Sequence, residues 1–201
     1  MGISVDRVPL RRGLFAAAVL LALVMTLALR AASPGLERAA AATSCPYANA
    51  SLEQLSLGAI KVSIVCQIRE ERAESGLSSL TSRRRLRRPG NRHNADMQLN
   101  LHYLTHSSSN GDSMTTRIRR YGYMSGANSW AVGEIIGQAW GLGATPRTIM
   151  NAWMRSSGHY HVIHTPRYRD FGVAVRRGTA RDVNASGALV TVDFGRRSPS
   201  L

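Results

Sequence analysis

The residues of this chain that could do chemistry are its six histidines, its serines and its two cysteines. No serine lies in a Gly-x-Ser-x-Gly sequence, which forms the tight turn that exposes a nucleophile in many hydrolases. Ser107 follows His106 directly, but adjacent side chains seldom face one another, so this pair is a poor nucleophile and base. The histidines remain the main candidates, because imidazole can bind a divalent metal or act as a general acid or base. His102 lies four residues before His106 and is expected to be structural or exposed.

The N-terminal segment indicates export. Three arginines, Arg7, Arg11 and Arg12, precede an apolar run over residues 14–29. This run is short for a bilayer span and slightly long for the core of a signal peptide. Small residues at 39–42 would permit cleavage just before Ala42 or Thr43. We therefore expect a signal peptide or an uncleaved N-terminal anchor over residues 1–42, and an extracellular protein that is secreted or held outside by that anchor; a buried core helix is the remaining alternative.

Cys45 and Cys66 are the only cysteines, and in an exported protein they are expected to form a disulfide. Two free buried thiols are the alternative. If one helix ran straight from Ser51, Cys66 would lie roughly 22 Å from its start, whereas the six residues back to Cys45 reach at most about 21 Å. The disulfide therefore predicts a break in the chain near residues 56–58.

The chain is strongly basic. Its formal net charge is +14, and Lys61 is its only lysine, so nearly all of the basic residues are arginines. The densest run covers residues 83–88, which form either a solvated helix face or a binding surface. A basic surface attracts nucleic acid, anionic lipid or acidic polymer without selecting among them. Because no nucleic-acid module is recognisable, we expect as partner a small ligand, a lipid among the candidates, or an anionic cell-envelope polymer, with membrane contact only through an uncleaved N-terminal segment.

The elements expected to position these residues are helices followed by strands. The length suits one domain, and apolar spacing with capping residues predicts helices over about residues 51–75, 86–101, 114–120 and 145–157. Pro89-Gly90 should kink or delay the second helix. Strands are predicted at 130–136 and in an antiparallel hairpin over 170–195, where Phe171, Val173 and Val175 should face the core while Asp193 points the other way. This order favours an α+β fold.

Eight short sequences in this order resemble the bacterial SCP-like branch of the CAP superfamily (cysteine-rich secretory proteins, antigen 5 and pathogenesis-related proteins). They are Glu70-Glu71-Arg72-Ala73-Glu74-Ser75-Gly76-Leu77, His93-Asn94-Ala95-Asp96-Met97, Thr105-His106-Ser107, Arg117-Ile118 with Gly122-Tyr123, Val132-Gly133-Glu134-Ile135-Ile136, Ala152-Trp153-Met154-Arg155-Ser156-Ser157-Gly158-His159, Phe171-Gly172-Val173-Ala174-Val175 and Val192-Asp193-Phe194-Gly195. The resemblance implies a three-layer α-β-α sandwich with a central, mainly antiparallel sheet. It places the domain at 51–196, after a linker at 43–50 and before a tail at 197–201.

The resemblance also implies that His106, Glu134 and His159 meet in a cleft. They match three of the four cleft residues that other members of the superfamily share; the second glutamate has no counterpart, and Ser156 is the nearest polar residue. Two histidines and one acid can bind zinc or another divalent metal, or can act without metal as acid and base; a hydrogen-bonded polar cluster is the third possibility. No cofactor is certain.

We therefore expect a ligand-binding or surface-interaction module rather than an enzyme. The alternative is an extracellular hydrolase, either metal-dependent or not, that uses His106, Glu134 and His159. Trp153 should lie in the core, and Trp140 either lies in the core or lines a cleft.

Overall fold

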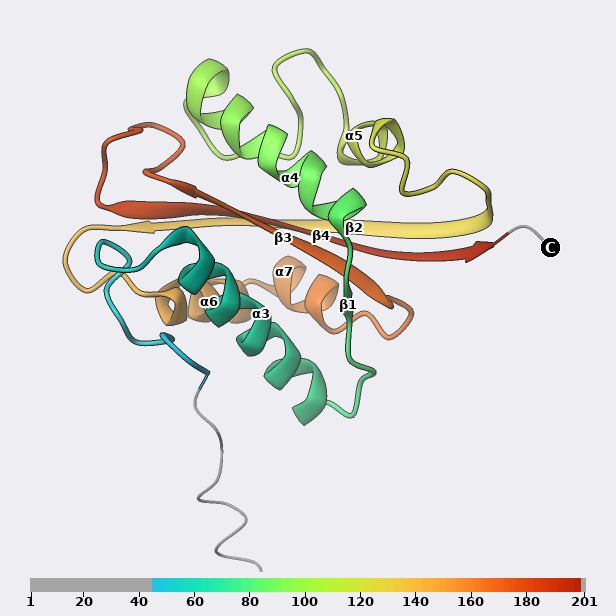
Figure 1. The fold of residues 1–201 in the computed structure, drawn as a ribbon, viewed down its shortest axis with the longest axis horizontal. Helices are drawn as coiled ribbons and strands as arrows, with labels where there is room; N and C mark the ends of the chain where they lie inside the picture. Colours follow the sequence, from blue (N-terminus) through green and yellow to red (C-terminus); the bar gives the residue numbers. More distant parts are fainter. Residues whose placement is uncertain (1–44, 200–201) are drawn as a thin grey trace, which may run out of the picture. The chain divides into compact units, whose positions relative to one another are not determined.

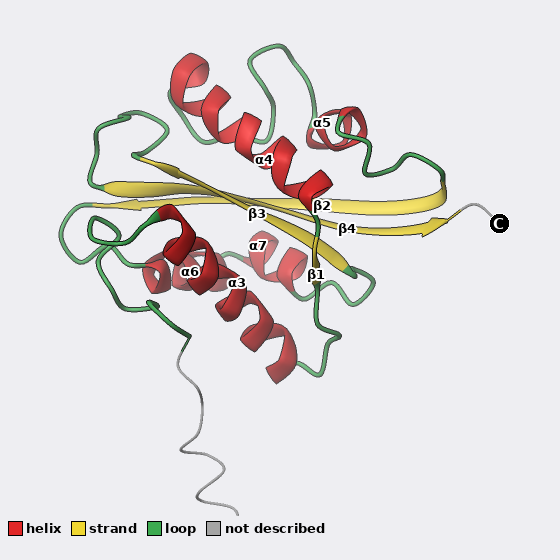
Figure 2. Cartoon of the chain, in the orientation of Figure 1, coloured by secondary structure: helices red, strands yellow, loops and turns green. Residues whose placement is uncertain are grey.

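The computed structural model describes residues 45–199, and the signal peptide or anchor expected at 1–42 lies outside this range. These residues form a sheet between two layers of helices (Figure 1). Helices α4 and α5 cover one face, and α3, α6 and α7 cover the other (Figure 2). The three-layer α-β-α sandwich expected from the sequence is confirmed. Within residues 45–199, no helix combines the length and the apolar character that crossing a bilayer requires.

The sheet has the strand order β1-β3-β4-β2. The strands are β1 (Thr81–Ser82), β2 (Ala127–Trp140), β3 (Asp170–Arg177) and β4 (Gly187–Pro199). The short β1 pairs in parallel with β3, whereas β4 pairs antiparallel with both β3 and β2. The sheet is therefore mainly antiparallel, as expected.

The hairpin of β3 and β4 has the predicted register. Phe171 lies opposite Phe194, and Val173 lies opposite Val192. These side chains belong to the main hydrophobic core on the α3 side of the sheet. Asp193 points to the opposite face, as expected, but it is only 1% exposed, because α4 covers that face.

The helices are α3 (Leu57–Glu74), α4 (Arg84–Asp96), the π-helix η1 (Met97–Leu101), α5 (Met114–Arg120), α6 (Pro146–Met154) and α7 (Ser157–Ile163). The helix starting at Ser51 was wrongly predicted: α3 begins at Leu57, and Ser56 caps it by accepting a hydrogen bond from the Ala59 amide. The break expected at 56–58 is thus present. Cys45 and Cys66 form the predicted disulfide, with a Cα–Cα distance of 5.5 Å.

Pro89 and Gly90 do not delay α4, which begins before them. Packing against the sheet accounts for this. A Cβ atom on Gly90 would lie 3.0 Å from the Ala174 Cβ and 3.3 Å from Thr191 Cγ2, so glycine allows the helix to approach β3 and β4 closely. Asn94, one turn further on, donates to the Ala174 carbonyl and accepts from the Thr191 hydroxyl.

Several boundaries differ from the prediction. β2 is twice the predicted strand, and Gly158 does not end a helix but lies in α7, which follows α6 after two residues. Residues 45–50 were assigned to a linker, yet Cys45 and Ala48 are buried. β4 continues to Pro199, past the expected domain end at 196.

Candidate functional site

Glu134 lies on β2 and holds His106 in a fixed orientation. The Nδ1 atom of His106 donates to Oε1 of Glu134 at 2.9 Å. The carboxylate is buried, whereas the imidazole side chain is 59% exposed. With its proton on Nδ1, the neutral ring presents the Nε2 lone pair outward. This arrangement suits His106 to bind a donor or a cation, or to accept a proton.

Arg117 on α5 neutralises Glu134. Its Nη2 atom donates to Oε2 of Glu134 at 2.7 Å, and both side chains are buried. Its Nη1 atom donates to the carbonyls of His106 and Asp112 and to the Ser108 hydroxyl. Burial alone would raise the pKa of Glu134, but the hydrogen bond from His106 and the charge of Arg117 lower it. Glu134 is therefore ionised at neutral pH.

The loop that carries His106 is fixed by residues of the His-x-x-Asp-Met sequence on α4. His93 is fully buried, and its Nε2 atom donates to the Thr105 carbonyl at 2.7 Å. Asp96 accepts from the Ser109 amide at 2.8 Å and also from its hydroxyl. His93 thus fixes the His106 loop from the interior, and Asp96 fixes it from a partly exposed position.

His159 lies near His106 but is not hydrogen-bonded to it. It sits on α7, inside the helix rather than past the end of one. Burial lowers the pKa of His159, and a positive charge on His106 would lower it further. Its Nδ1 atom is buried and has no hydrogen-bond partner among residues 45–199. His159 is thus a neutral imidazole near the His106–Glu134 pair.

A second acid faces Glu134 from the adjacent strand. Asp193 on β4 is the direct cross-strand partner of Glu134, and neither of its oxygens has a hydrogen-bond partner among the described residues. Burial raises the pKa of Asp193 well above its usual range, and the charge of Glu134 raises it further. Burial and the neighbouring negative charge therefore both favour the protonated form of Asp193 beside the ionised Glu134.

The donor set does not fit a tightly bound zinc. Both oxygens of Glu134 are taken by His106 and Arg117, which leaves two imidazoles as ligands. Structural zinc takes four protein ligands and catalytic zinc usually three. Within residues 45–199, three potential ligand atoms lie within 4.8 Å of one another only at Cys45, Cys66 and Glu70, where both sulfurs form the disulfide.

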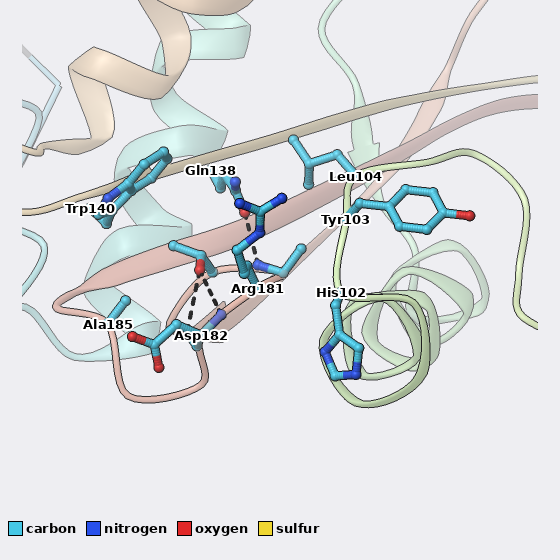
Figure 3. A pocket seen from close by; sticks show the side chains of 10 residues that line it. His102, Tyr103, Leu104, Gln138, Trp140, Arg181, Asp182 and Ala185 are labelled. Carbon is cyan, nitrogen blue, oxygen red and sulfur yellow. Dashed lines mark hydrogen bonds between the residues drawn. The ribbon is translucent and has the colours of Figure 1, made fainter.

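A pocket of about 330 Å³ lies at one end of the sheet. It is lined by the segment after η1, the end of β2 and the loop between β3 and β4 (Figure 3). Trp140 is 58% exposed and lines this pocket, as one of the two expectations for it allowed. Trp153 is buried in the core. Tyr103 and Leu104 add exposed apolar surface, and Arg181 projects between them and Trp140 in Figure 3.

The sequence did not indicate the roles of Arg117, of Asp193 or, apart from Trp140, of the residues of this pocket. Arg117 and Asp193 belong to the motifs that carry the resemblance, so the sequence did mark these positions. It did not show that both side chains are buried, because their burial depends on the packing of α4 and α5 against the sheet. Arg181 lies in a loop whose sequence gives no signal of binding.

Comparison with known proteins agrees with this architecture. An outer surface protein of Borrelia burgdorferi is similar in structure, with a TM-score of 0.59 and 20% identity over 72% of this chain and 97% of that one. An extracellular protein of Bacillus anthracis that contains an SCP domain has a TM-score of 0.51 and 21% identity over 70% of this chain and 42% of that one. Both likenesses concern the fold.

No curated protein sequence matches this one. The model of the cysteine-rich secretory protein family, CAP, matches residues 67–194. This match covers Glu134, His106, Arg117, His159 and Asp193, which we call the His106 cluster, and it includes α4, α5, β2 and α7. The chain therefore belongs to the CAP family.

Proposed function

We propose that this protein works outside the cell as a binding module and takes a small ligand with an anionic group and an apolar body. The observation that carries the proposal is the pocket beside Trp140. Its aromatic and aliphatic side chains surround one guanidinium, that of Arg181, which has no hydrogen-bond or ion-pair partner among residues 45–199. Ligand pockets typically combine apolar walls with a few polar groups that fix orientation.

The polar groups of the pocket are partly engaged already. The Gln138 Oε1 atom accepts from the Ala180 amide at 2.8 Å, which leaves its NH₂ group as a donor. Asp182 accepts from the Asn184 amide and so holds its own loop. Arg181 and the NH₂ group of Gln138 are donors at this wall of the pocket, and both can bind a carboxylate or phosphate group. Stacking on Trp140 and contact with Leu104 suit the apolar part of the ligand.

An extracellular location is supported by two findings. The similar structures are described as an outer surface protein and an extracellular protein. The Cys45–Cys66 disulfide suits an oxidising compartment. Fractionation of the producing cells, with the mature N-terminus determined by mass spectrometry, tests the location and distinguishes a cleaved signal peptide from an anchor.

The ligand proposal is tested with decanoate as probe, using calorimetry and tryptophan fluorescence on the purified protein. We expect binding, and we expect Arg181→Gln or Trp140→Ala to weaken it by about tenfold, equivalent to about 1.4 kcal/mol. Arg155→Gln and Trp130→Ala are matched controls, because both residues are exposed and neither lines the pocket. Equal binding by all four variants would refute the assignment.

A hydrolase is the second candidate, and the orientation of His106 by a buried carboxylate favours it. In that case Nε2 would take a proton from water during attack on an ester or amide. Within residues 45–199 no serine or cysteine side chain is hydrogen-bonded to the His106 ring, which is why binding is ranked first. Hydrolysis of nitrophenyl esters or casein that is lost in His106→Ala, and unaffected by chelator, would reverse this ranking.

A further inference from the structure

Two adjoining hollows near the start of α4 are lined by basic side chains. The larger, of about 670 Å³, is lined by Arg83, Arg84, Arg85, Arg169, Arg197 and four other residues. The smaller, of about 260 Å³, shares Arg83 and Arg84 and adds Lys61 and Arg87. We call the two together the basic groove. The basic groove shares no residue with the Trp140 pocket or with the His106 cluster.

Most of this charge is not neutralised within the fold. The only acid in either lining is Asp170, whose Oδ1 atom accepts from Arg83 at 2.7 Å and whose Oδ2 atom accepts from the Tyr123 hydroxyl at 2.8 Å. The side chains of Arg84, Arg87 and Lys61 have no hydrogen-bond or ion-pair partner among residues 45–199. These three side chains are available to an external anion.

The other arginines are held by carbonyl groups and not by acids. Arg85 donates to the Gly122 carbonyl and Arg197 to the Tyr123 carbonyl. Arg169 donates to the carbonyls of Pro166 and Tyr168. These bonds fix the direction of each guanidinium and leave its charge in place, so the groove is both positive and partly pre-organised.

The start of α4 adds to the same field. This helix has 13 residues, and its N-cap, Arg83, makes no side-chain capping bond. The positive end of the helix dipole therefore faces the groove without an acidic cap. It strengthens the attraction for an anion that the arginines already provide.

We propose that the basic groove binds one strand of a linear polymer that carries phosphate groups along its length. Guanidinium groups match the geometry of phosphate oxygens and can bind them with two hydrogen bonds. Two hollows that share arginines suit consecutive anionic groups of one strand better than a single ion. The lining contains one aliphatic side chain, Val173, and no exposed aromatic ring. A membrane surface or a stacked base would therefore find little apolar contact here.

The test measures binding of long-chain inorganic polyphosphate to the purified protein at several salt concentrations. The variant is Arg84→Gln/Arg87→Gln, because neither side chain holds the fold. The control is Arg92→Gln/Arg155→Gln, which removes the same charge at two exposed sites outside the groove. Melting temperatures of both variants verify that they are folded.

We expect the wild type and the control to bind polyphosphate with a steep salt dependence. The groove variant should bind at least about tenfold more weakly, and its plot of log affinity against log salt should be shallower by about 1.5. Equal affinity for both variants would mean that only net charge matters and would overturn the proposal.

Two further probes separate other partners. Vesicles of phosphatidylglycerol that bind while polyphosphate does not would overturn the proposal in favour of a membrane surface. A single-stranded oligodeoxynucleotide that binds far more tightly than polyphosphate would overturn it in favour of base recognition. Decanoate binding is a separate measurement on other residues, so failure of the Trp140 pocket leaves this test unaffected.

Discussion

At the scale of single residues, the His106 cluster is organised by the balance of charge around Glu134. One cation, Arg117, and one imidazole, His106, bond to its two oxygens, and a protonated Asp193 faces it from β4. The sequence led us to expect that His106, Glu134 and His159 lie close together. It did not indicate that Glu134 is already occupied, because that depends on the burial of Arg117 beneath the loop that carries His106.

Asp193→Asn is expected to stabilise the protein near neutral pH. The pKa of Asp193 is raised in the folded state, so wild-type stability falls as pH rises above the ordinary value of the acid, since only the unfolded chain then releases the proton. Asparagine removes this dependence. Thermal unfolding between pH 3 and pH 8 should show equal stability at the acid end and a growing advantage for the variant above it. A constant difference at all pH values would contradict the protonated acid.

Glu134→Gln should have the opposite effect. The pKa of Glu134 is lowered, so the ionised carboxylate contributes stability above its usual value of 4.5, which is lost as pH falls through the folded pKa. Near neutral pH the substitution removes the carboxylate that bonds directly to the buried Arg117, and we expect a loss of about 3 kcal/mol in the free energy of unfolding.

A double variant distinguishes the two acids. In Glu134→Gln, Asp193 can ionise and replace the missing charge beside Arg117. Adding Asp193→Asn to Glu134→Gln should therefore destabilise the protein further, although the same change stabilises the wild type. Denaturant unfolding of the four proteins provides the measurement. Additive effects would show that the two carboxyl groups do not interact.

At the scale of elements, the close approach of α4 to the sheet positions both the His106 cluster and the basic groove. Gly172 on β3 makes this possible, because a Cβ atom there would lie 2.2 Å from the Arg87 amide nitrogen. Backbone atoms cannot move aside as a flexible side chain can. The close approach of α4 to β3 thus depends on residues that have little or no side chain.

Gly172→Ala should push α4 away from the sheet and destabilise the protein by about 3 kcal/mol. Gly58→Ala is the control: its Cβ would have no contact closer than 3.6 Å, to the Ser56 hydroxyl, and alanine favours the helix. We expect this control to be neutral or stabilising in thermal unfolding. Similar melting temperatures for the two variants would contradict the close packing.

The sequence predicted the elements better than their ends. α5 was predicted with its observed limits, and Thr145-Pro146 correctly marked the start of α6, because capping and proline act locally. α7 was missed, since Gly158 is ordinarily a stop signal. The strand predicted at 130–136 was too short, because the residues on either side of it lack strand propensity and are held in β2 by pairing with β4. Contacts across the sheet determine where these elements begin and end, and the local sequence alone does not reveal those contacts.

At the scale of the whole domain, the three functional candidates lie in different places. The His106 cluster uses β2, α5 and α7, the Trp140 pocket uses the end of the sheet, and the basic groove uses the start of α4. The resemblance predicted only the first, because the other two are built mainly from loops and arginines outside the shared motifs.

Reduction of the disulfide should destabilise the domain by about 3 kcal/mol on the chain-entropy estimate, because it frees a loop that joins Cys45 to the middle of α3. Comparing the unfolding of the oxidised protein with that of Cys45→Ser/Cys66→Ser measures this loss. No change in stability would mean that residues 45–56 contribute little to the fold.

The same bond determines how the domain responds to mechanical load. A pull on the chain ahead of Cys45 reaches α3 at Cys66 through the two sulfurs, so the residues between them are bypassed. Once the bond is reduced, the 20 residues between the cysteines can be pulled into an extended chain, which lengthens the N-terminal connection by up to about 70 Å. In a protein held by its N-terminus, oxidation would therefore set a short, stiff connection, and reduction would lengthen the reach of the domain from its attachment point.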